Sequence, residues 1–286
     1  MPELPEVETI RRDLASRIVK DKVTQVEIRD TKTVKNTAGS FRTLVVGKKV
    51  EDIDRKGKLL ALELDSGQYI LVHLKMTGQL IWKSKHKIVA GGHSFSDSAC
   101  NFSERFTRLV LTFSSGGKLY FNDMRRFGYV KVVTKEEKEK VFANNFGPEP
   151  LTKEFTPEAF GKLFAKRTTN IKALLLNQKL IAGLGNIYVD ETLFAAGIRP
   201  TRRANTITKP EIAKLYLEIN RIIALAIKHR GTTFYSFVDC EGEKGSFVHL
   251  LKVYDRAGEK CAKCGGMVAK TRVAGRGTHY CPKCQK

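Results

Sequence analysis

The first residues of the chain, Met1-Pro-Glu-Leu-Pro-Glu-Val-Glu8, are of types that could carry covalent chemistry. A small residue at position two usually permits removal of the initiator methionine, which would leave the secondary amine of Pro2 next to Glu3. An α-amino group with a pKa of about 7.7 to 8.0 is roughly one-tenth neutral at pH 7, and a helix N-terminus behind it disfavours protonation further. The sequence therefore predicts a nucleophilic amine at Pro2. The same residue types also fit an ordinary first helical turn.

A second group of chemically distinctive residues lies at the other end of the chain. Cys261-Ala-Lys-Cys264 is followed, after sixteen residues, by Cys281-Pro-Lys-Cys284. Two thiolate pairs at this spacing match a tetrahedral zinc ribbon, and the zinc would be structural because protein sulfurs fill all four positions. We therefore expect one structural zinc ion, bound by Cys261, Cys264, Cys281 and Cys284. Cys100 and Cys240 receive no role.

Composition favours a polyanionic partner. The chain has 286 residues, of which 51 are Lys or Arg and 30 are Asp or Glu, giving a formal net charge of +21. Such an excess favours nucleic acid. No apolar run approaches 18 residues, and the first twenty residues are charged throughout, so the sequence predicts neither a membrane span nor a signal peptide. We expect an intracellular protein of about two domains with reduced cysteines.

The element that must hold Pro2 and Glu3 is a helix at the start of the chain. Apolar residues recur there at three- and four-residue spacing, which predicts one buried face; they are Leu4, Val7, Ile10, Leu14 and Ile18. Strand patterns follow. The sequence predicts a strand at 23–28, a hairpin of 59–64 with 69–73, a second hairpin of 109–113 with 118–121, and a strand at 129–133 that continues the second sheet. These elements predict a β-sandwich or barrel preceded by one helix.

The rest of the chain is expected to be helical. Residues 84–104 are polar and predict a mobile insertion, and residues 135–142 predict a charged helix before the boundary at 146–150. Helix starts are predicted at Thr156 and at the capping box 208–211. Between them, the helical run 171–180 breaks at a glycine-rich turn and resumes at Asn186. Such a turn can direct backbone N–H groups at a phosphate, although a helical hairpin without a ligand uses the same residue types.

Six motifs, in this order, resemble the formamidopyrimidine-DNA glycosylases, which are base-excision repair enzymes. They are Pro2-Glu-Leu-Pro-Glu-Val-Glu8, His73-Leu-Lys-Met-Thr-Gly78, Asp123-Met-Arg-Arg-Phe-Gly128, Gly147-Pro-Glu-Pro-Leu151, Gly183-Leu-Gly-Asn-Ile-Tyr188, and the cysteine ribbon with Arg276-Gly-Thr278. The resemblance runs from Pro2 to Lys286. It implies an α+β multidomain fold with DNA bound in a cleft between domains. The expected parts are an N-terminal β-sandwich with a leading helix at 2–134, a linker at 135–150, a helix-two-turn-helix domain at 151–254 and a zinc ribbon at 255–286.

The resemblance also implies catalytic roles. Pro2 would attack C1′ of the damaged nucleoside, and the cationic iminium formed by a secondary amine is an electron sink for strand cleavage. Glu3 would shuttle protons. Lys58 would contact phosphate and assist the first elimination, and Arg276 the second. Glu6 would order the amine and nearby water.

Further residues match DNA-binding positions of the family. An enzyme of this kind must extrude its target base and fill the space that is left. Met76, Arg125 and Phe127 match the inserted set, with Phe127 as the wedge and Arg125 bonded to the orphaned cytosine. The other expected DNA contacts are Glu6, Arg108, Arg167, Lys172 and Asn186. The loop between Gly231 and Phe247 corresponds to a lid over oxidised purines.

The chain departs from the family pattern at several positions. Where a His-Asp-His run is common, this chain has Phe106-Thr-Arg108, so only Arg108 offers a cation. Met124 replaces a usual proline, Asn177 a usual aspartate and Lys75 a usual glycine. None of these changes touches Pro2, Glu3 or Lys58, so they bear on DNA affinity and lesion preference more than on the reaction class.

We therefore expect a bifunctional DNA glycosylase and abasic-site lyase that acts on oxidised purines by β,δ-elimination. Its partner would be duplex DNA containing oxidised bases or abasic sites, and we expect a cytoplasmic, nucleoid-associated bacterial monomer with no membrane contact. Two alternatives stay open. One is an endonuclease VIII-like enzyme for oxidised pyrimidines, which usually has glycine where Leu4 stands. The other is a non-enzymatic zinc-ribbon protein that binds nucleic acid, for which Pro2-Glu3 and Lys58 would be coincidental.

Overall fold

The computed structural model describes residues 1–84, 88–92, 104–165, 167–232 and 245–286. Cys100, Cys240, part of the predicted insertion and most of the predicted lid lie outside these ranges. The chain divides into two compact units. The first unit contains residues 1–143 and 229–248, and the second contains 144–228 and 249–286. Among the helices described, none is both long enough and apolar enough to cross a bilayer.

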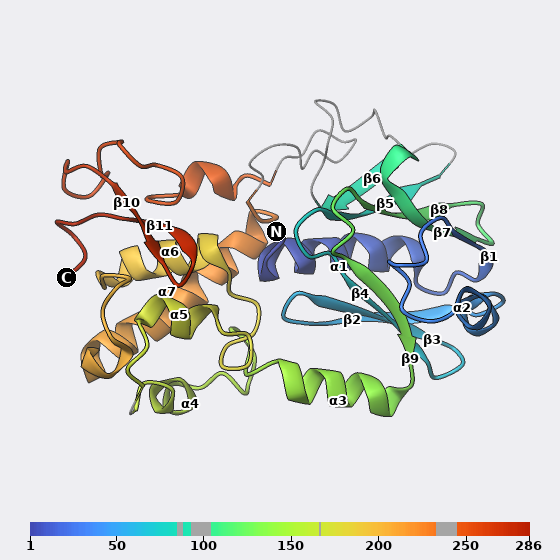
Figure 1. Ribbon diagram of the computed structural model, residues 1–286, viewed down its shortest axis with the longest axis horizontal. Helices are drawn as coiled ribbons and strands as arrows, with labels where there is room; N and C mark the ends of the chain where they lie inside the picture. The colour runs from blue at the N-terminus through green and yellow to red at the C-terminus, as the bar shows by residue number, and fades with distance from the viewer. Residues whose placement is uncertain (85–87, 93–103, 166, 233–244) are drawn as a thin grey trace. The chain divides into compact units, whose positions relative to one another are not determined.

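The first unit contains two antiparallel sheets, as the sequence predicts (Figure 1). One sheet has the strand order β1-β7-β8-β5-β6 and the other β2-β3-β4-β9. The strands are β1 (Val23–Ile28), β2 (Val50–Lys56), β3 (Leu59–Leu64), β4 (Tyr69–His73), β5 (Gly78–Lys83), β6 (Ile88–Gly92), β7 (Thr107–Phe113), β8 (Lys118–Asp123) and β9 (Tyr129–Val133). Side chains alternate along β7, so Leu109 and Leu111 enter the central core, whereas Val110 joins a smaller cluster with Ile81 and Tyr120.

The helix α1 (Leu4–Ile18) completes this core, and its predicted apolar face is confirmed. Leu4, Val7, Ile10, Leu14 and Ile18 are all at most 3% exposed. The helix contacts β2 and β3 of one sheet and β6 of the other, and Figure 1 shows it running between them. Burial of five large apolar side chains at about 1.5–3 kcal/mol each makes α1 a part of the fold rather than an appended end.

Both predicted hairpins are confirmed, as β3–β4 and β7–β8. The prediction for 129–133 is wrong, because β9 pairs with β4 in the other sheet rather than continuing the second hairpin. The chain crosses between the sheets in the loop after Asp123. The sequence pattern also missed the helix α2 (Ala38–Val45), which Thr37 caps by accepting a hydrogen bond from the N–H of Ser40. Within the predicted insertion, β6 and the 3₁₀ turn η1 (Glu104–Phe106) are regular.

The second unit contains the predicted helices and the ribbon. They are α4 (Pro157–Lys162), α5 (Ile171–Leu176), α6 (Asn186–Ala196), α7 (Lys209–Lys228), the 3₁₀ turns η2 (Ala204–Thr206) and η3 (Phe247–Leu250), and the hairpin β10 (Ala269–Val273) with β11 (Arg276–Tyr280). The first two residues of η3 belong to the first unit. The linker helix α3 (Lys135–Asn145) precedes them. Helix α6 packs against α7 and β11. Residues 229–248, which the predicted domains place in the helical part, belong to the first unit.

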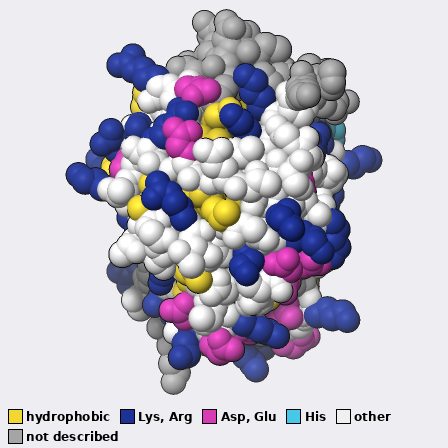
Figure 2. Space-filling view, turned by 90° about the vertical axis from the view of Figure 1, so that its right-hand side faces the viewer, with side chains coloured by type: hydrophobic (Ala, Val, Ile, Leu, Met, Phe, Trp, Pro, Cys, Tyr) yellow, Lys and Arg dark blue, Asp and Glu magenta, His cyan; other side chains and the backbone are white. Residues whose placement is uncertain are grey.

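Basic side chains are spread widely over the surface. Figure 2 shows one face, on which Lys and Arg side chains are scattered throughout while Asp and Glu gather in smaller groups. Apolar side chains form only small separate patches on this face. The net charge of +21 is therefore not confined to one tail of the chain.

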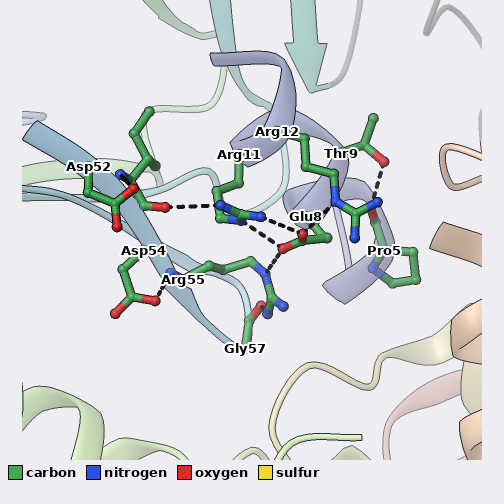
Figure 3. A network of polar contacts seen from close by, with 10 residues as sticks. Pro5, Glu8, Thr9, Arg11, Arg12, Asp52, Asp54, Arg55 and Gly57 are labelled. Carbon is green, nitrogen blue, oxygen red and sulfur yellow. Dashed lines mark hydrogen bonds and ion pairs between the residues drawn. The ribbon is translucent and has the colours of Figure 1, made fainter. Parts of the chain in front are cut away.

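A buried carboxylate joins α1 to β2 and to the turn that follows it (Figure 3). Glu8 accepts hydrogen bonds from Arg11 and Arg12 on its own helix, at 2.7–3.0 Å, and from Arg55 Nε at 3.1 Å. Arg55 also donates through Nη1 to the carbonyl of Gly57, at 2.9 Å. Burial by itself raises the pKa of Glu8, but the three arginines outweigh it and lower the pKa to about 2.

We predict that Glu8→Gln destabilises the first unit by about 2 kcal/mol at pH 7, because a buried ionised partner of three arginines is lost. The pKa in the folded chain is about 2 against an ordinary 4.5, so the contribution is complete above pH 4.5 and disappears as the pH falls towards 2. The gap between wild type and variant should close over that window. Urea unfolding followed by the fluorescence of Trp82, the one tryptophan of the sequence, measures it.

Glu51→Gln is the matched control, since Glu51 pairs with Lys20 and Lys49 at the surface. Surface pairs contribute little to stability, so this variant should unfold almost as the wild type does. A gap between Glu8→Gln and wild type that stayed constant down to pH 2 would show that Glu8 does not act through its charge.

Candidate active site

The start of the chain is held against the first unit. Pro2 is buried, and Glu3, which is 3% exposed, occupies the N-cap position of α1. The N–H of Glu3 donates to Glu6 Oε2 at 2.9 Å, as in one half of a capping box. Pro2 therefore lies directly before the positive end of a helix dipole, which favours the neutral form of an amine.

Glu6 links this chain start to a distant segment of the same unit. Its second oxygen, Oε1, accepts from the N–H of Thr232 at 2.7 Å. Gly231 has φ +84°, and a Cβ at that position would lie 2.7 Å from Glu6 Oε1, so only glycine fits. An isolated bridge between Thr232 and Ser246 brings together the two ends of the predicted lid. Glu6 thus orders the backbone at Glu3, next to the candidate nucleophile, and at Thr232.

Lys58 lies in the two-residue turn between β2 and β3 and is 4% exposed. Gly57 precedes it with φ +58°, and Arg55 holds the Gly57 carbonyl. Burial first, and then the charges of Lys75 and Lys58, lower the pKa of His73 to about 3. Since His73 Nδ1 accepts from the N–H of Lys75 at 3.0 Å, the neutral ring carries its proton on Nε2. The neutral His73 ring therefore lies beside two cations, Lys58 and Lys75.

The three residues predicted to enter the base stack lie in two turns. Met76 is half-buried between β4 and β5, while Arg125 and Phe127 lie between β8 and β9. Phe127 is 55% exposed, and the Arg125 guanidinium lies over its ring at 4.7 Å from the centroid. A large apolar side chain displayed beside a cation fits insertion next to a phosphate backbone better than core packing.

Arg108 is placed differently from the expectation of a DNA-facing cation. It is half-buried, and its Nε donates to the carbonyl of Asp123 at 2.9 Å. Arg108 therefore supports the start of the loop that carries Arg125 and Phe127.

In the second unit, two predicted residues meet at one carbonyl. Gly277 O accepts from Lys172 Nζ at 3.2 Å and from Asn186 Nδ2 at 2.9 Å, and Arg276 is the exposed residue before it. Lys172 is completely buried and pairs with Asp190 at 2.6 Å. The structure therefore gives Lys172 a supporting place behind the ribbon hairpin, away from solvent, whereas the sequence assigned it a contact with the DNA backbone. Arg167 is exposed in the segment between α4 and α5.

The four predicted zinc ligands converge. Their sulfur atoms all lie within 4.8 Å of one another, with Cys261–Cys284 at 3.9 Å and Cys264–Cys281 at 3.5 Å. Zn–S bonds of about 2.3 Å in a tetrahedron place sulfurs about 3.8 Å apart, so the donor set fits one zinc ion. Among the described residues no other group of metal-ligating side chains is found. Zinc here holds the ribbon, which presents Arg276.

Sequence reasoning missed two buried carboxylates on α6, Asp190 and Glu191. Asp190 Oδ2 also accepts from the N–H of His279 at 2.9 Å, which joins α6 to β11. Glu191 accepts from the N–H groups of Lys252, Val253 and Tyr254, at 2.8–3.0 Å. The signal was available in the sequence as two adjacent acids inside an otherwise apolar helix.

Three successive parts of the chain match known protein families. Residues 1–130 match the Formamidopyrimidine-DNA glycosylase N-terminal domain, residues 146–237 match the Formamidopyrimidine-DNA glycosylase H2TH domain, and residues 258–286 match the Zinc finger found in FPG and IleRS. The formamidopyrimidine-DNA glycosylases of Desulfitobacterium hafniense and Carboxydothermus hydrogenoformans are each 41% identical to this chain, over 100% of both sequences.

Solved structures agree. A variant of Lactococcus lactis FPG, in complex with DNA containing Fapy-dG, is 35% identical and superposes with a TM-score of 0.90 over 100% of both chains. Lactococcus lactis Fpg in complex with DNA containing an abasic site gives a TM-score of 0.89 over 99% of both chains, at 35% identity. With matches to all three parts in order and relatives of this identity along its whole length, the chain belongs to the formamidopyrimidine-DNA glycosylase family.

Proposed function

We propose that this protein excises oxidised purines, such as 8-oxoguanine and formamidopyrimidines, from duplex DNA and then cleaves the strand as an abasic-site lyase. The observation that carries the proposal is the placement of Pro2 and Glu3, buried and held by Glu6, directly before the N-terminus of α1. An exposed, mobile chain end would not supply an oriented nucleophile.

The chemistry follows from these residues once Met1 has been removed. The Pro2 nitrogen bonds to C1′ of the damaged nucleotide, and the bond from C1′ to the base breaks, so that the electron pair leaves with the base. Glu3 moves protons between the departing base, the opening sugar and the amine. The iminium then withdraws electrons as a proton is lost from C2′ and the 3′ phosphate leaves, and a second elimination releases the 5′ phosphate. Water finally hydrolyses the iminium and frees Pro2.

Lys58 and Arg276 supply positive charge for the two departing phosphates. Lys58 is fixed by its turn and by Arg55, whereas Arg276 is exposed on the zinc ribbon. Phe127, Arg125 and Met76 fill the space of the extruded nucleotide. Arg167 and Asn186 bind the backbone.

Two other functions explain the observations less well. Leu4 is 1% exposed and packs in the core, whereas enzymes for oxidised pyrimidines usually have glycine at this position. A non-enzymatic zinc-ribbon protein would need neither a buried Pro2-Glu3 pair nor an exposed Phe127. The named relatives are bacterial, so we place the protein in the bacterial cytoplasm, acting as a monomer on nucleoid DNA.

We predict that borohydride traps a covalent complex between this protein and a duplex containing 8-oxoguanine or an abasic site. A tag fused before residue two should abolish trapping, because an acylated amine has no available lone pair. The same tag placed after Lys286 is the matched control and should leave trapping intact. Lys58→Ala should still trap. Undiminished trapping by protein whose Met1 is verified by mass spectrometry as retained would place the nucleophile elsewhere.

The wedge role predicts a difference between two substrates. Phe127→Ala should slow excision of 8-oxoguanine from duplex DNA about tenfold or more, since extrusion of a paired, stacked base costs a few kcal/mol. Cleavage of a preformed abasic site should fall much less, because its base is already gone. Single-turnover rates on both duplexes measure the difference. Equal losses on the two substrates would contradict a wedge.

Removal of the zinc should affect DNA binding and not the first unit. We predict one zinc per chain by metal analysis, and we expect Cys261→Ser to weaken binding to lesion duplex at least about tenfold because the ribbon loses a ligand. Trp82 fluorescence should report a folded first unit in this variant. Ala262→Ser, which keeps all four thiolates, is the control. Purified, unchelated protein without zinc would be incompatible with this prediction.

A further inference from the structure

The two turns that carry the inserted residues are tied to one buried carboxylate. We propose that Asp123, acting with Thr77, is the positioning residue that holds Met76, Arg125 and Phe127 as one preorganised wedge. Neither Asp123 nor Thr77 would touch DNA. The inference rests on the proposed function, because it concerns how base extrusion is achieved.

Asp123 closes the loop that contains Arg125 and Phe127. Its side chain is completely buried at the end of β8. Oδ1 accepts from the N–H of Arg125 at 3.1 Å, and Oδ2 accepts from the N–H of Gly128 at 2.7 Å. Arg125, within the loop 124–127, and Gly128, directly after it, are thus bound to the two oxygens of a single side chain.

The same carboxylate reaches the turn that contains Met76. The Thr77 hydroxyl donates to Asp123 Oδ1 and accepts from the N–H of Arg125 at 3.1 Å. This contact lies where β5 and β8 pair, with Gly78 opposite Asp123. Thr77 is 7% exposed, so no solvent bridge is needed between the two turns. A shift of either turn therefore breaks a buried hydrogen bond to the other.

Close packing leaves the two turns little freedom. A Cβ on Gly78 would lie 2.4 Å from the carbonyl oxygen of Leu74, and a Cβ on Gly128 would lie 2.7 Å from the ring of Phe121 and 3.0 Å from Asp123 Oδ2. Arg108 holds the carbonyl of Asp123 from β7. The tip of the loop is exposed while its base is fixed. The conformational entropy of the wedge is therefore lost when the protein folds and not when it binds DNA.

This arrangement explains why an exposed Phe127 remains available. An unrestrained loop would gain by laying the ring on the protein surface, and insertion would then have to undo that contact. The carboxylate clamp removes this competing state. Loosening the clamp should therefore slow the step that needs the wedge and spare the later covalent steps.

The test compares Thr77→Val, which is nearly isosteric and lacks the hydroxyl, with Thr77→Ser, which retains it. Excision of 8-oxoguanine from duplex and cleavage of a preformed abasic duplex are measured under single-turnover conditions. Thr77→Val should reduce the ratio of the two rates about tenfold, corresponding to one lost buried hydrogen bond expressed in one step. Thr77→Ser should retain most of the wild-type ratio. Asp123→Asn should lower the ratio, as Thr77→Val does.

Thr107→Val is the matched control. Thr107 is also buried in this sheet, and its hydroxyl donates to Asn122 Oδ1 at 2.8 Å without touching loop 124–127. It should leave the ratio unchanged, even if it lowers the melting temperature. An equal fall on both substrates for Thr77→Val, or the same change in ratio for Thr107→Val, overturns the proposal.

Failure of the inference can be told from failure of the proposed function. Wild-type protein that neither excises 8-oxoguanine nor cleaves abasic DNA would refute the function itself. An active wild type with an unchanged ratio in Thr77→Val and Asp123→Asn refutes only the clamp. If Thr77→Val melts below the assay temperature, the ratio of the two rates in Asp123→Asn decides instead. The clamp then stands only if Thr77→Ser also keeps the wild-type ratio.

Discussion

A chain terminus is usually among the most mobile parts of a protein, and the chemistry proposed for Pro2 requires this terminus to be held still. The constraint is met by burial of α1 between two sheets and by the carboxylates on its first turns. Glu6 accepts hydrogen bonds from backbone N–H groups, and Glu8 accepts them from guanidinium groups. The apolar face fixes where the helix lies, and the carboxylates fix what surrounds its start.

Buried acidic or basic side chains lie behind several of the residues proposed for the site. Asp123 stands behind the exposed Phe127, Arg55 behind Lys58, and the Lys172–Asp190 pair behind Arg276. Such groups are weak contributors to net stability, because the cost of desolvation offsets much of the Coulombic attraction. They contribute mainly by orienting their neighbours, since a buried charged group tolerates few arrangements of its hydrogen-bond partners. The displayed residues themselves can then remain exposed.

Periodicity and short-range spacing predicted a large part of this structure. The buried face of α1, both hairpins and the cysteine cluster depend on residues close in sequence, and the structure confirms them. Partners far along the chain were beyond such patterns. Strand β9 fits either sheet by its own alternation, and its pairing with β4 is set by the loop closed on Asp123. The sequence indicated exposed cations at Arg108 and Lys172. Their acceptors, Asp123 and Asp190, become neighbours only in the folded chain.

The bridge made by Glu6 has a thermodynamic consequence. One carboxylate binds the backbone at both Glu3 and Thr232, so the free energies of the chain start and of the lid base are linked. Linkage is reciprocal, so if order at Thr232 favours order at Glu3 by some factor, order at Glu3 favours order at Thr232 by the same factor. The order of the chain start therefore depends on the order of the backbone at Thr232. A substitution that loosens the backbone at Thr232 would therefore also loosen the start of α1, although Glu6 and Thr232 lie 226 residues apart in the sequence.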